Sequence, residues 1–258
     1  MIRSIATLGE YTLASLRETG KVSLFVVRSV FCCFVPPFFI KETLKQVMAV
    51  GFYSLPIVGL TALFAGMVLA LQMHVGFTRF NAEGAVASVV VIGITRELGP
   101  VFAGLMVAGR LGSSIAAEIG SMKVSEQIDA LLTLRVDPLK FLVAPRIISG
   151  VLMLPFLVLV ADIIGVMGGF LVATTVLNFS SGTYLAQTVQ SLEAIDVISG
   201  LVKASAFGFC ITSFGCYHGF SSDLGARGVG RATTSSVVSS CIGVLVLNYL
   251  LTALFFGT

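Results

Sequence analysis

The sequence predicts an all-α integral membrane protein with five transmembrane helices. Residues 46–78 contain no Asp, Glu, Lys or Arg, and comparable apolar blocks recur four times before the C-terminus. About 20 apolar helical residues cross the ~30 Å hydrocarbon core of a bilayer, so each block is long enough to span it. The composition agrees, because 56% of the 258 residues are hydrophobic and 11% are charged. The mean hydropathy of +1.01 is far from that of a soluble domain.

The uncharged stretches predict spans at 47–73, 84–110, 145–175, 197–217 and 234–256. Basic residues in the connections set the orientation of such a bundle. Six precede the first span, five lie between the second and third, and two lie between the fourth and fifth, whereas the opposite side has Arg79 alone. We therefore expect the N-terminus to be cytoplasmic and the C-terminus to lie outside.

The N-terminal segment 1–45 is expected to be an amphipathic helix in the cytoplasmic interface, followed by a five-helix domain at 46–258. Residues 22–40 are apolar enough to suggest a sixth span, but Arg28 lies inside them and a Pro-Pro pair at 36–37 would break the helix. A span here would also move basic residues to the outer side. The apolar face that should point toward lipid is formed by Ile5, Leu8, Leu13 and Leu16.

The chain contains no recognisable catalytic or nucleotide-binding motif. Its Gly20-Lys21 pair is followed by Val22, so a phosphate-binding loop with its Ser or Thr is missing. His74 and His218 are predicted near opposite membrane faces, and the five cysteines have no metal-ligand spacing. We expect no enzymatic activity, cofactor, metal or nucleic-acid partner. Energy for uphill transport would have to come from a partner chain or an ion gradient.

The second predicted span carries two adjacent charges, Arg96 and Glu97. Intramembrane charges are costly and usually face the bundle interior or a wet cavity. Two interpretations are open: an ion pair that joins helices, or the polar rim of a substrate cavity. Because neighbouring helical residues point about 100° apart, at least one of the two should serve another helix, subunit or ligand. Gly99-Pro100 should kink the helix and free a carbonyl there.

The connection after this span, about 118–140, has two further features. Residues 109–122 contain small residues at three- and four-residue spacing, which allow close helix contact. Ser125 is expected to cap a short helix with an apolar face of Ile128, Leu131 and Leu132, and Asp137-Pro138 is expected to start the next helix. The connection is either a membrane-hugging linker or a docking helix for another protein.

Several of these segments together resemble the MlaE (YrbE) family, the permease subunits of bacterial ABC lipid transporters that work with MCE proteins. The resemblance covers nearly everything from about residue 46 onward. It is carried by Gly66–Gln72, Glu97-Leu-Gly-Pro-Val, Ala108-Gly-Arg, Ala117-Glu-x-Gly-x-Met, Glu126-Gln127, Asp137-Pro138, Pro145-Arg146, Gly228-x-Gly-x-Ala-Thr-Thr234 and Leu251–Gly257.

The resemblance implies a homodimer in the bacterial inner membrane, with an N-terminal interfacial helix in each subunit. It implies a cytoplasmic ABC ATPase on the connection between the second and third spans, often with a STAS-domain protein. A periplasmic MCE protein is expected on the outer face, and phospholipid in a cavity at the dimer interface. The residues implied for lipid binding are Leu69, Phe77, Phe80, Arg96 and Glu97, and those for ATPase coupling are Glu118, Glu126, Gln127, Ile128 and Asp129.

Two further intramembrane charges, Asp162 and Lys203, have several possible roles. They could form one buried ion pair between the third and fourth spans, or the lysine could extend toward the outer interface. As a functional alternative, both could join Glu97 in the ion relay of a gradient-coupled secondary transporter. The lack of an internal repeat and the odd number of spans argue against that class. A scaffold protein would not need charges at this depth.

Overall fold

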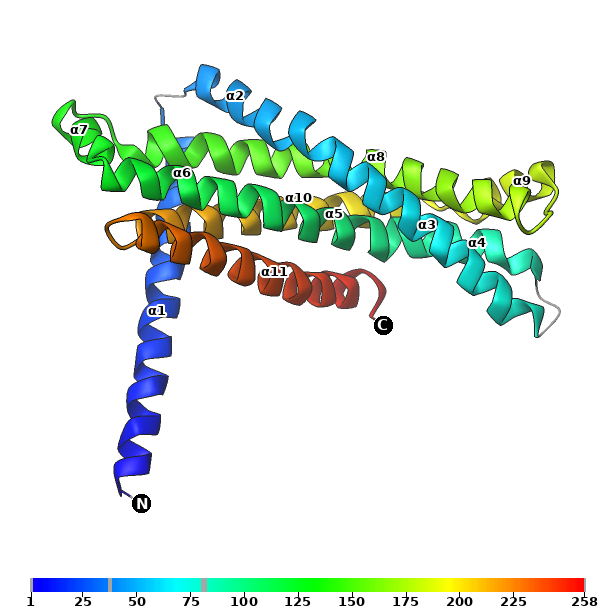
Figure 1. The fold of residues 1–258 in the computed structure, drawn as a ribbon, viewed down its shortest axis with the longest axis horizontal. Coiled ribbons are helices and arrows are strands. Elements are labelled where there is room, and N and C mark those ends of the chain that lie inside the picture. The colour runs from blue at the N-terminus through cyan, green and yellow to red at the C-terminus, as the bar shows by residue number, and fades with distance from the viewer. Residues whose placement is uncertain (1, 37–38, 80–82, 258) are drawn as a thin grey trace.

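The computed structural model describes residues 2–36, 39–79 and 83–257, and all regular elements in these ranges are helices (Figure 1). The α-helices are α1 Ile2–Phe34, α2 Ile40–Val50, α3 Leu55–Thr78, α4 Val86–Gly93, α5 Gly99–Val107, α6 Ser113–Val124, α7 Gln127–Thr133, α8 Ala144–Thr175, α9 Ser181–Ser191, α10 Ala194–Phe220 and α11 Ala226–Phe256. Two 3-10 turns, η1 Phe52–Ser54 and η2 Glu83–Ala85, and three π-helical segments, η3 Ile94–Leu98, η4 Ala108–Gly112 and η5 Leu139–Val143, join them.

Five continuous helical runs in the described ranges are long and apolar enough to cross a membrane. They are Ile40–Thr78, Val86–Val124, Leu139–Thr175, Ala194–Phe220 and Ala226–Phe256. The predicted count of five is confirmed, but every run is longer than its predicted span. The largest difference is at the end of the second run, which continues through η3 and η4 to Val124 instead of ending near residue 110.

The N-terminal segment is two helices rather than one helix up to residue 45. α1 ends at Phe34, before the Pro-Pro pair, and α2 begins at Ile40 and leads directly into the first span. α1 runs crosswise to the long helices of the bundle (Figure 1). Leu13 and Leu16 are exposed on it, as predicted, whereas the side chains of Ile5 and Leu8 lie outside the described part of the chain.

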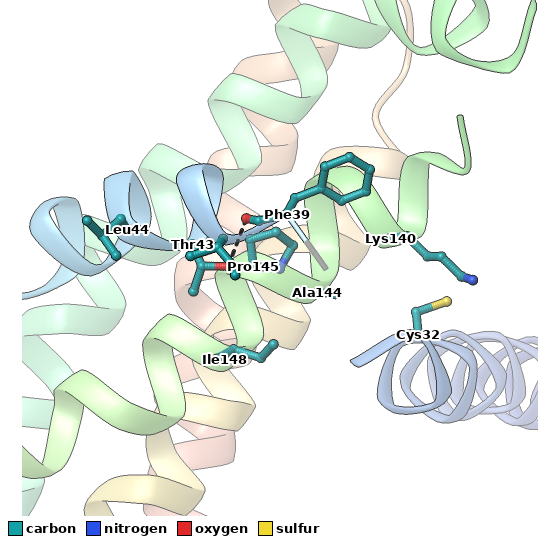
Figure 2. A pocket seen from close by; sticks show the side chains of 9 residues that line it. Cys32, Phe39, Thr43, Leu44, Lys140, Ala144, Pro145 and Ile148 are labelled. Atoms are coloured by element: carbon teal, nitrogen blue, oxygen red, sulfur yellow. Dashed lines mark hydrogen bonds between the residues drawn. The ribbon is translucent and has the colours of Figure 1, made fainter. Parts of the chain in front are cut away.

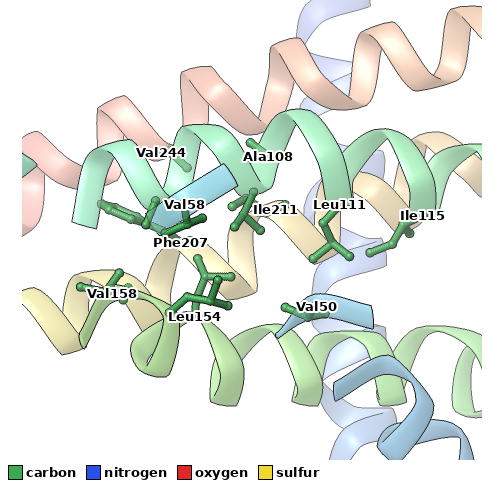
Figure 3. Packing of buried hydrophobic residues seen from close by; sticks show 14 of the residues in the cluster. Val50, Val58, Ala108, Leu111, Ile115, Leu154, Val158, Phe207, Ile211 and Val244 are labelled. Carbon is green, nitrogen blue, oxygen red and sulfur yellow. The ribbon is translucent and has the colours of Figure 1, made fainter. Parts of the chain in front are cut away.

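The bundle is held together by close crossings of α3, α8 and α10. A Cβ on Gly66 of α3 would overlap the carbonyl of Gly165 in α8, and one on Gly208 of α10 would overlap the carbonyl of Gly150 in α8. Hydrocarbon gives no hydrophobic drive for helix association, so such backbone contact and side-chain packing carry the stability. Figure 3 shows the packed core around Phe207, with the neighbouring residues Leu154, Val158 and Ile211.

Enlarging one of these glycines should separate two helices. We expect Gly208→Val to destabilise the chain by about 2 kcal/mol or more, because the backbones at the crossing cannot absorb the added methyl groups. The measurement is the Tm of detergent-purified protein by intrinsic fluorescence or a thiol-reactive dye. Gly76→Val is the matched control, since a Cβ there meets no atom within 4 Å. Equal Tm losses in the two variants would contradict the assignment.

Both ends of the bundle differ in detail from the sequence prediction. At one end, Ser125 ends α6 instead of capping α7, and its hydroxyl donates to the Ser121 carbonyl at 2.9 Å. Asp137 does start the next helical segment, because its carboxylate accepts the Leu139 N–H at 2.9 Å. At the other end lies α9, a helix that was not predicted from the sequence. These ends are called the α7 end and the α9 end below.

Candidate functional site

The two adjacent charges lie in a π-helical segment of the second span. η3 carries Arg96 and Glu97 and is followed by Gly99-Pro100. Pro100 has no N–H to donate to the Arg96 carbonyl four residues earlier, so that carbonyl needs another donor. The ammonium of Lys203 in α10 supplies it at 2.8 Å. The carbonyl that Pro100 was predicted to release therefore accepts a hydrogen bond from a fully buried lysine.

The carboxylate of Glu97 joins three transmembrane runs. Its Oε1 lies 2.7 Å from Lys203 Nζ of α10 and accepts the Thr252 hydroxyl of α11 at 2.9 Å. Its Oε2 accepts the side-chain N–H of Asn248, also in α11, at 2.9 Å. Removing one member of a buried ion pair leaves an uncompensated charge and is strongly destabilising. Glu97 is thus mainly a structural tie between the second, fourth and fifth spans.

The Arg96 side chain is anchored on one edge and open on the other. Its Nε lies 2.5 Å from Oδ1 of Asp196, a fully buried residue at the start of α10. Its guanidinium lies over the Phe256 ring of α11, 4.4 Å from the centroid. Among the described residues, its two terminal nitrogens make no hydrogen bond, and the side chain is 30% exposed. A guanidinium has five N–H donors, so this edge remains able to bind an anion.

The inference that at least one of the two charges serves another helix is confirmed, because Arg96 pairs with Asp196 and Glu97 pairs with Lys203, both in α10. Within the described chain, Glu97 makes no hydrogen bond or ion pair with Arg96, so it does not orient the arginine directly. Four partners of these charges were not predicted from the sequence: Asp196, Asn248, Thr252 and Phe256. A signal was present for Asn248, a strongly polar residue inside the otherwise apolar run 234–256. We call the set Arg96, Glu97, Asp196, Lys203, Asn248 and Thr252 the polar network.

Asp162 and Lys203 do not pair, so the predicted ion pair is wrong. Lys203 does not extend outward either, because it is fully buried against Glu97. Asp162 is 7% exposed, and within the described chain its Oδ1 has no hydrogen-bond partner. Its carboxyl group packs against Gly99, where a Cβ would overlap it. Asp162 therefore adjoins the end of η3 without joining the polar network.

The apolar residues nominated for lipid form a second group beside η3. Leu69 and Phe77 of α3 are half-buried and pack on a small cluster that includes Val90 and Ile94. Ile94 is the first residue of η3, so this apolar cluster adjoins the segment that carries the charges. Phe80, the third nominated apolar residue, lies outside the described residues.

The residues nominated for ATPase coupling lie at the α7 end, apart from the polar network. Glu118 lies 2.8 Å from the buried guanidinium of Arg146 in α8, so it is a structural ion pair as well as a surface group. Glu126 has a positive φ of 58° at the α6–α7 corner. Gln127 and Asp129 are exposed, whereas Ile128 is half-buried on the core. α7 has no buried residue, which suits a docking element.

Comparison with known proteins places these features in one family. Residues 43–254 match the family described as Permease MlaE. A probable ABC transporter permease protein of Rickettsia bellii is 54% identical over 257 residues, which are 99% of each chain. A probable ABC transporter permease protein of Synechocystis is 38% identical over 216 residues, 84% of this chain and 82% of the relative. The intermembrane phospholipid transport system permease protein MlaE of Haemophilus influenzae is 38% identical over 214 residues, 83% of this chain and 82% of the relative.

Proposed function

Because this chain belongs to the MlaE permease family, whose relatives are permease subunits of ABC transporters and not themselves enzymes, we propose that it moves phospholipid. In this proposal it is a homodimer in the bacterial inner membrane, driven by a cytoplasmic ABC ATPase. A periplasmic MCE protein receives or delivers the lipid, and a STAS-domain protein accompanies the ATPase. The ion-gradient alternative does not stand, since the relatives are ABC permeases.

The proposed orientation puts the α7 end in the cytoplasm and the α9 end outside. The asymmetry of basic residues supports it, because Arg79 is the single Lys or Arg outside the spans on the α9 side of the sequence. α1 then lies in the cytoplasmic interface, consistent with its crosswise direction and its exposed leucines (Figure 1). With this orientation Arg96 faces the outer half of the bilayer.

One observation carries the phospholipid proposal: the open edge of the Arg96 guanidinium at membrane depth. Asp196 pairs with the Nε edge of the guanidinium, so the two terminal nitrogens are held in place and keep their N–H donors free. A planar, permanently charged guanidinium matches the oxygens of a phosphate. Leu69 and Phe77 supply apolar surface next to η3 for an acyl chain. In the dimer, these groups form the headgroup and tail parts of one lipid site.

The test is purification of the intact complex in mild detergent. We expect an ATPase subunit and an MCE protein to copurify, and extracted lipid to give phospholipid in mass spectrometry. The Asp196→Asn/Arg96→Gln double variant, which removes the cation and its counterion together, should assemble the same complex with little phospholipid. A complex that contains no phospholipid in its parent form would overturn the assignment.

The coupling role of α7 makes a separate prediction. Leu132 is 56% exposed on α7, so Leu132→Glu should leave the fold intact and release the ATPase. Ile128→Asp is a poorer test, because Ile128 packs on the core. Val189→Glu on α9, where Val189 is 74% exposed, is the matched control at the other end. Pull-down of the ATPase should fail for the first variant alone. If both Leu132→Glu and Val189→Glu retain the ATPase, α7 is not the docking element.

A further inference from the structure

Two open cavities flank the crossing of α1 and α8, at the α7 end of the bundle. The first has a volume of about 300 Å³ and lies between α1, α2 and the first turns of α8 (Figure 2). The second has a volume of about 330 Å³ and lies between α1, α8 and α10. Ile148 of α8 lines both cavities, so they adjoin each other at this side chain. Both volumes fall in the range of small-molecule sites.

The walls of both cavities are mainly hydrocarbon. The second is formed by aliphatic and aromatic side chains and Cys33, including Val30, Phe34 and Phe209. The first is formed largely by Phe39, Leu44, Pro145 and Ile148, with a few polar groups at its rim. Such walls suit acyl chains, which surround these helices in a membrane. Two cavities that adjoin at Ile148 suit the two acyl chains of one phospholipid molecule.

The rim of the first cavity carries the cation of Lys140, with the carboxylate of Asp137 also close enough to act on Cys32. Figure 2 shows Lys140 reaching from η5 toward Cys32 of α1. The Lys140 ammonium donates to the Pro36 carbonyl at 3.1 Å, which leaves it further donors. Arg28 is exposed one helical turn before Cys32, on the same face of α1. Asp137 accepts the Leu139 N–H and keeps its negative charge, so Lys140 and Arg28 (two positive charges) together with Asp137 (one negative) leave a net charge of +1 beside the cavity.

We propose that this crossing holds one resident anionic phospholipid, with its chains in the two cavities that adjoin at Ile148 and its phosphate at Lys140 and Arg28. Basic pockets between helices on the cytoplasmic side are a common way to bind acidic lipids. The lipid fastens α1 to α8. The site shares no residue with the polar network, so it is distinct from the site of the transported lipid, and its cytoplasmic position rests on the proposed orientation.

The cysteine at the rim provides a direct readout. Burial raises the pKa of the Cys32 thiol, and Asp137 raises it further while Lys140 lowers it. In a variant that keeps Cys32 as its single cysteine, a neutral maleimide should react several-fold more slowly in phosphatidylglycerol nanodiscs than in phosphatidylcholine nanodiscs. The control places the single cysteine at the neighbouring exposed position by Phe31→Cys with Cys32→Ser. Both thiols experience the same surface potential, so the ratio of the two rates isolates the site.

Two substitutions decide the proposal. Lys140→Gln should make the maleimide reaction rate at Cys32 equal in the two kinds of nanodisc. Ile148→Trp should fill both cavities and remove one tightly held phospholipid per subunit in native mass spectrometry, whereas Ile163→Trp on the exposed face of α8 should not. Equal maleimide labelling of Cys32 in phosphatidylglycerol and phosphatidylcholine nanodiscs would overturn the proposal. A difference in labelling rate that survives Lys140→Gln would also overturn it. The labelling result decides it even if Ile148→Trp fails to fold.

Discussion

Lys203→Met should be one of the most destabilising single substitutions in this chain. It removes the cation that lies 2.7 Å from Glu97 and the donor that satisfies the Arg96 carbonyl. The half-buried Glu97 carboxylate keeps its hydrogen bonds from Asn248 and Thr252 but loses its cation, and the Arg96 carbonyl loses its donor. Breaking a buried ion pair costs up to about 3–5 kcal/mol. We expect the purified variant to show a large fall in Tm and reduced expression.

The double variant Lys203→Met with Glu97→Gln tests the cause of that loss. Glutamine carries no charge and keeps one of the two oxygens that accept from Asn248 and Thr252, so more than half of the lost stability should return. Lys41→Met, at an exposed lysine, is the control and should leave Tm unchanged. If the double variant is no more stable than Lys203→Met, the ion pair is not the source of the effect.

Arg96→Lys should separate lipid binding from folding. A lysine ammonium can still pair with the buried carboxylate of Asp196, so Tm should change by only a few degrees. It cannot offer a second planar edge, so retained phospholipid should fall roughly tenfold, the equivalent of ~1.4 kcal/mol. Phosphorus analysis of the purified complex measures the retained lipid. A parallel loss of stability and lipid in Arg96→Lys would make Arg96 a structural residue only.

Arg96→Glu does not test lipid binding in the way that Arg96→Lys does, because Arg96 pairs with Asp196. The substitution places two acids next to each other in a buried site, where the low dielectric strengthens their repulsion. We expect this variant to fail to accumulate. Its loss of transport would therefore say nothing about lipid.

Hydropathy predicted the five spans because lipid allows few alternatives to a fully hydrogen-bonded helix. Hydropathy did not separate α1 from α2, since Phe34 and Ile40 lie in one apolar stretch, but the Pro-Pro pair at 36–37 did predict the break between them. α9 was missed because its polar sequence resembles an ordinary connection and its single fully enclosed aromatic side chain, Tyr184, gives no periodic signal. Elements in lipid were thus easier to predict than elements in water.

The candidate site was predictable in its charges but not in its partners. Helix geometry alone implied that Arg96 and Glu97 point in different directions. Their partners depend on rotation and tilt, which place Lys203 against Glu97 and turn Asp162 toward the bare backbone of Gly99. Counting residues along ideal helices could not reveal this, because η3 shifts the register within the second span.

The most direct test of the central claim is phospholipid crosslinking from position 69 in the assembled complex. A photoreactive amino acid at Leu69 should capture phosphorus-labelled phospholipid, and Arg96→Lys should reduce that capture roughly tenfold. The same amino acid at Ile163, on the exposed face of α8, reports bulk lipid and should be unaffected by Arg96→Lys. Capture at position 69 that is independent of Arg96 and no greater than at position 163 would contradict a lipid site beside η3.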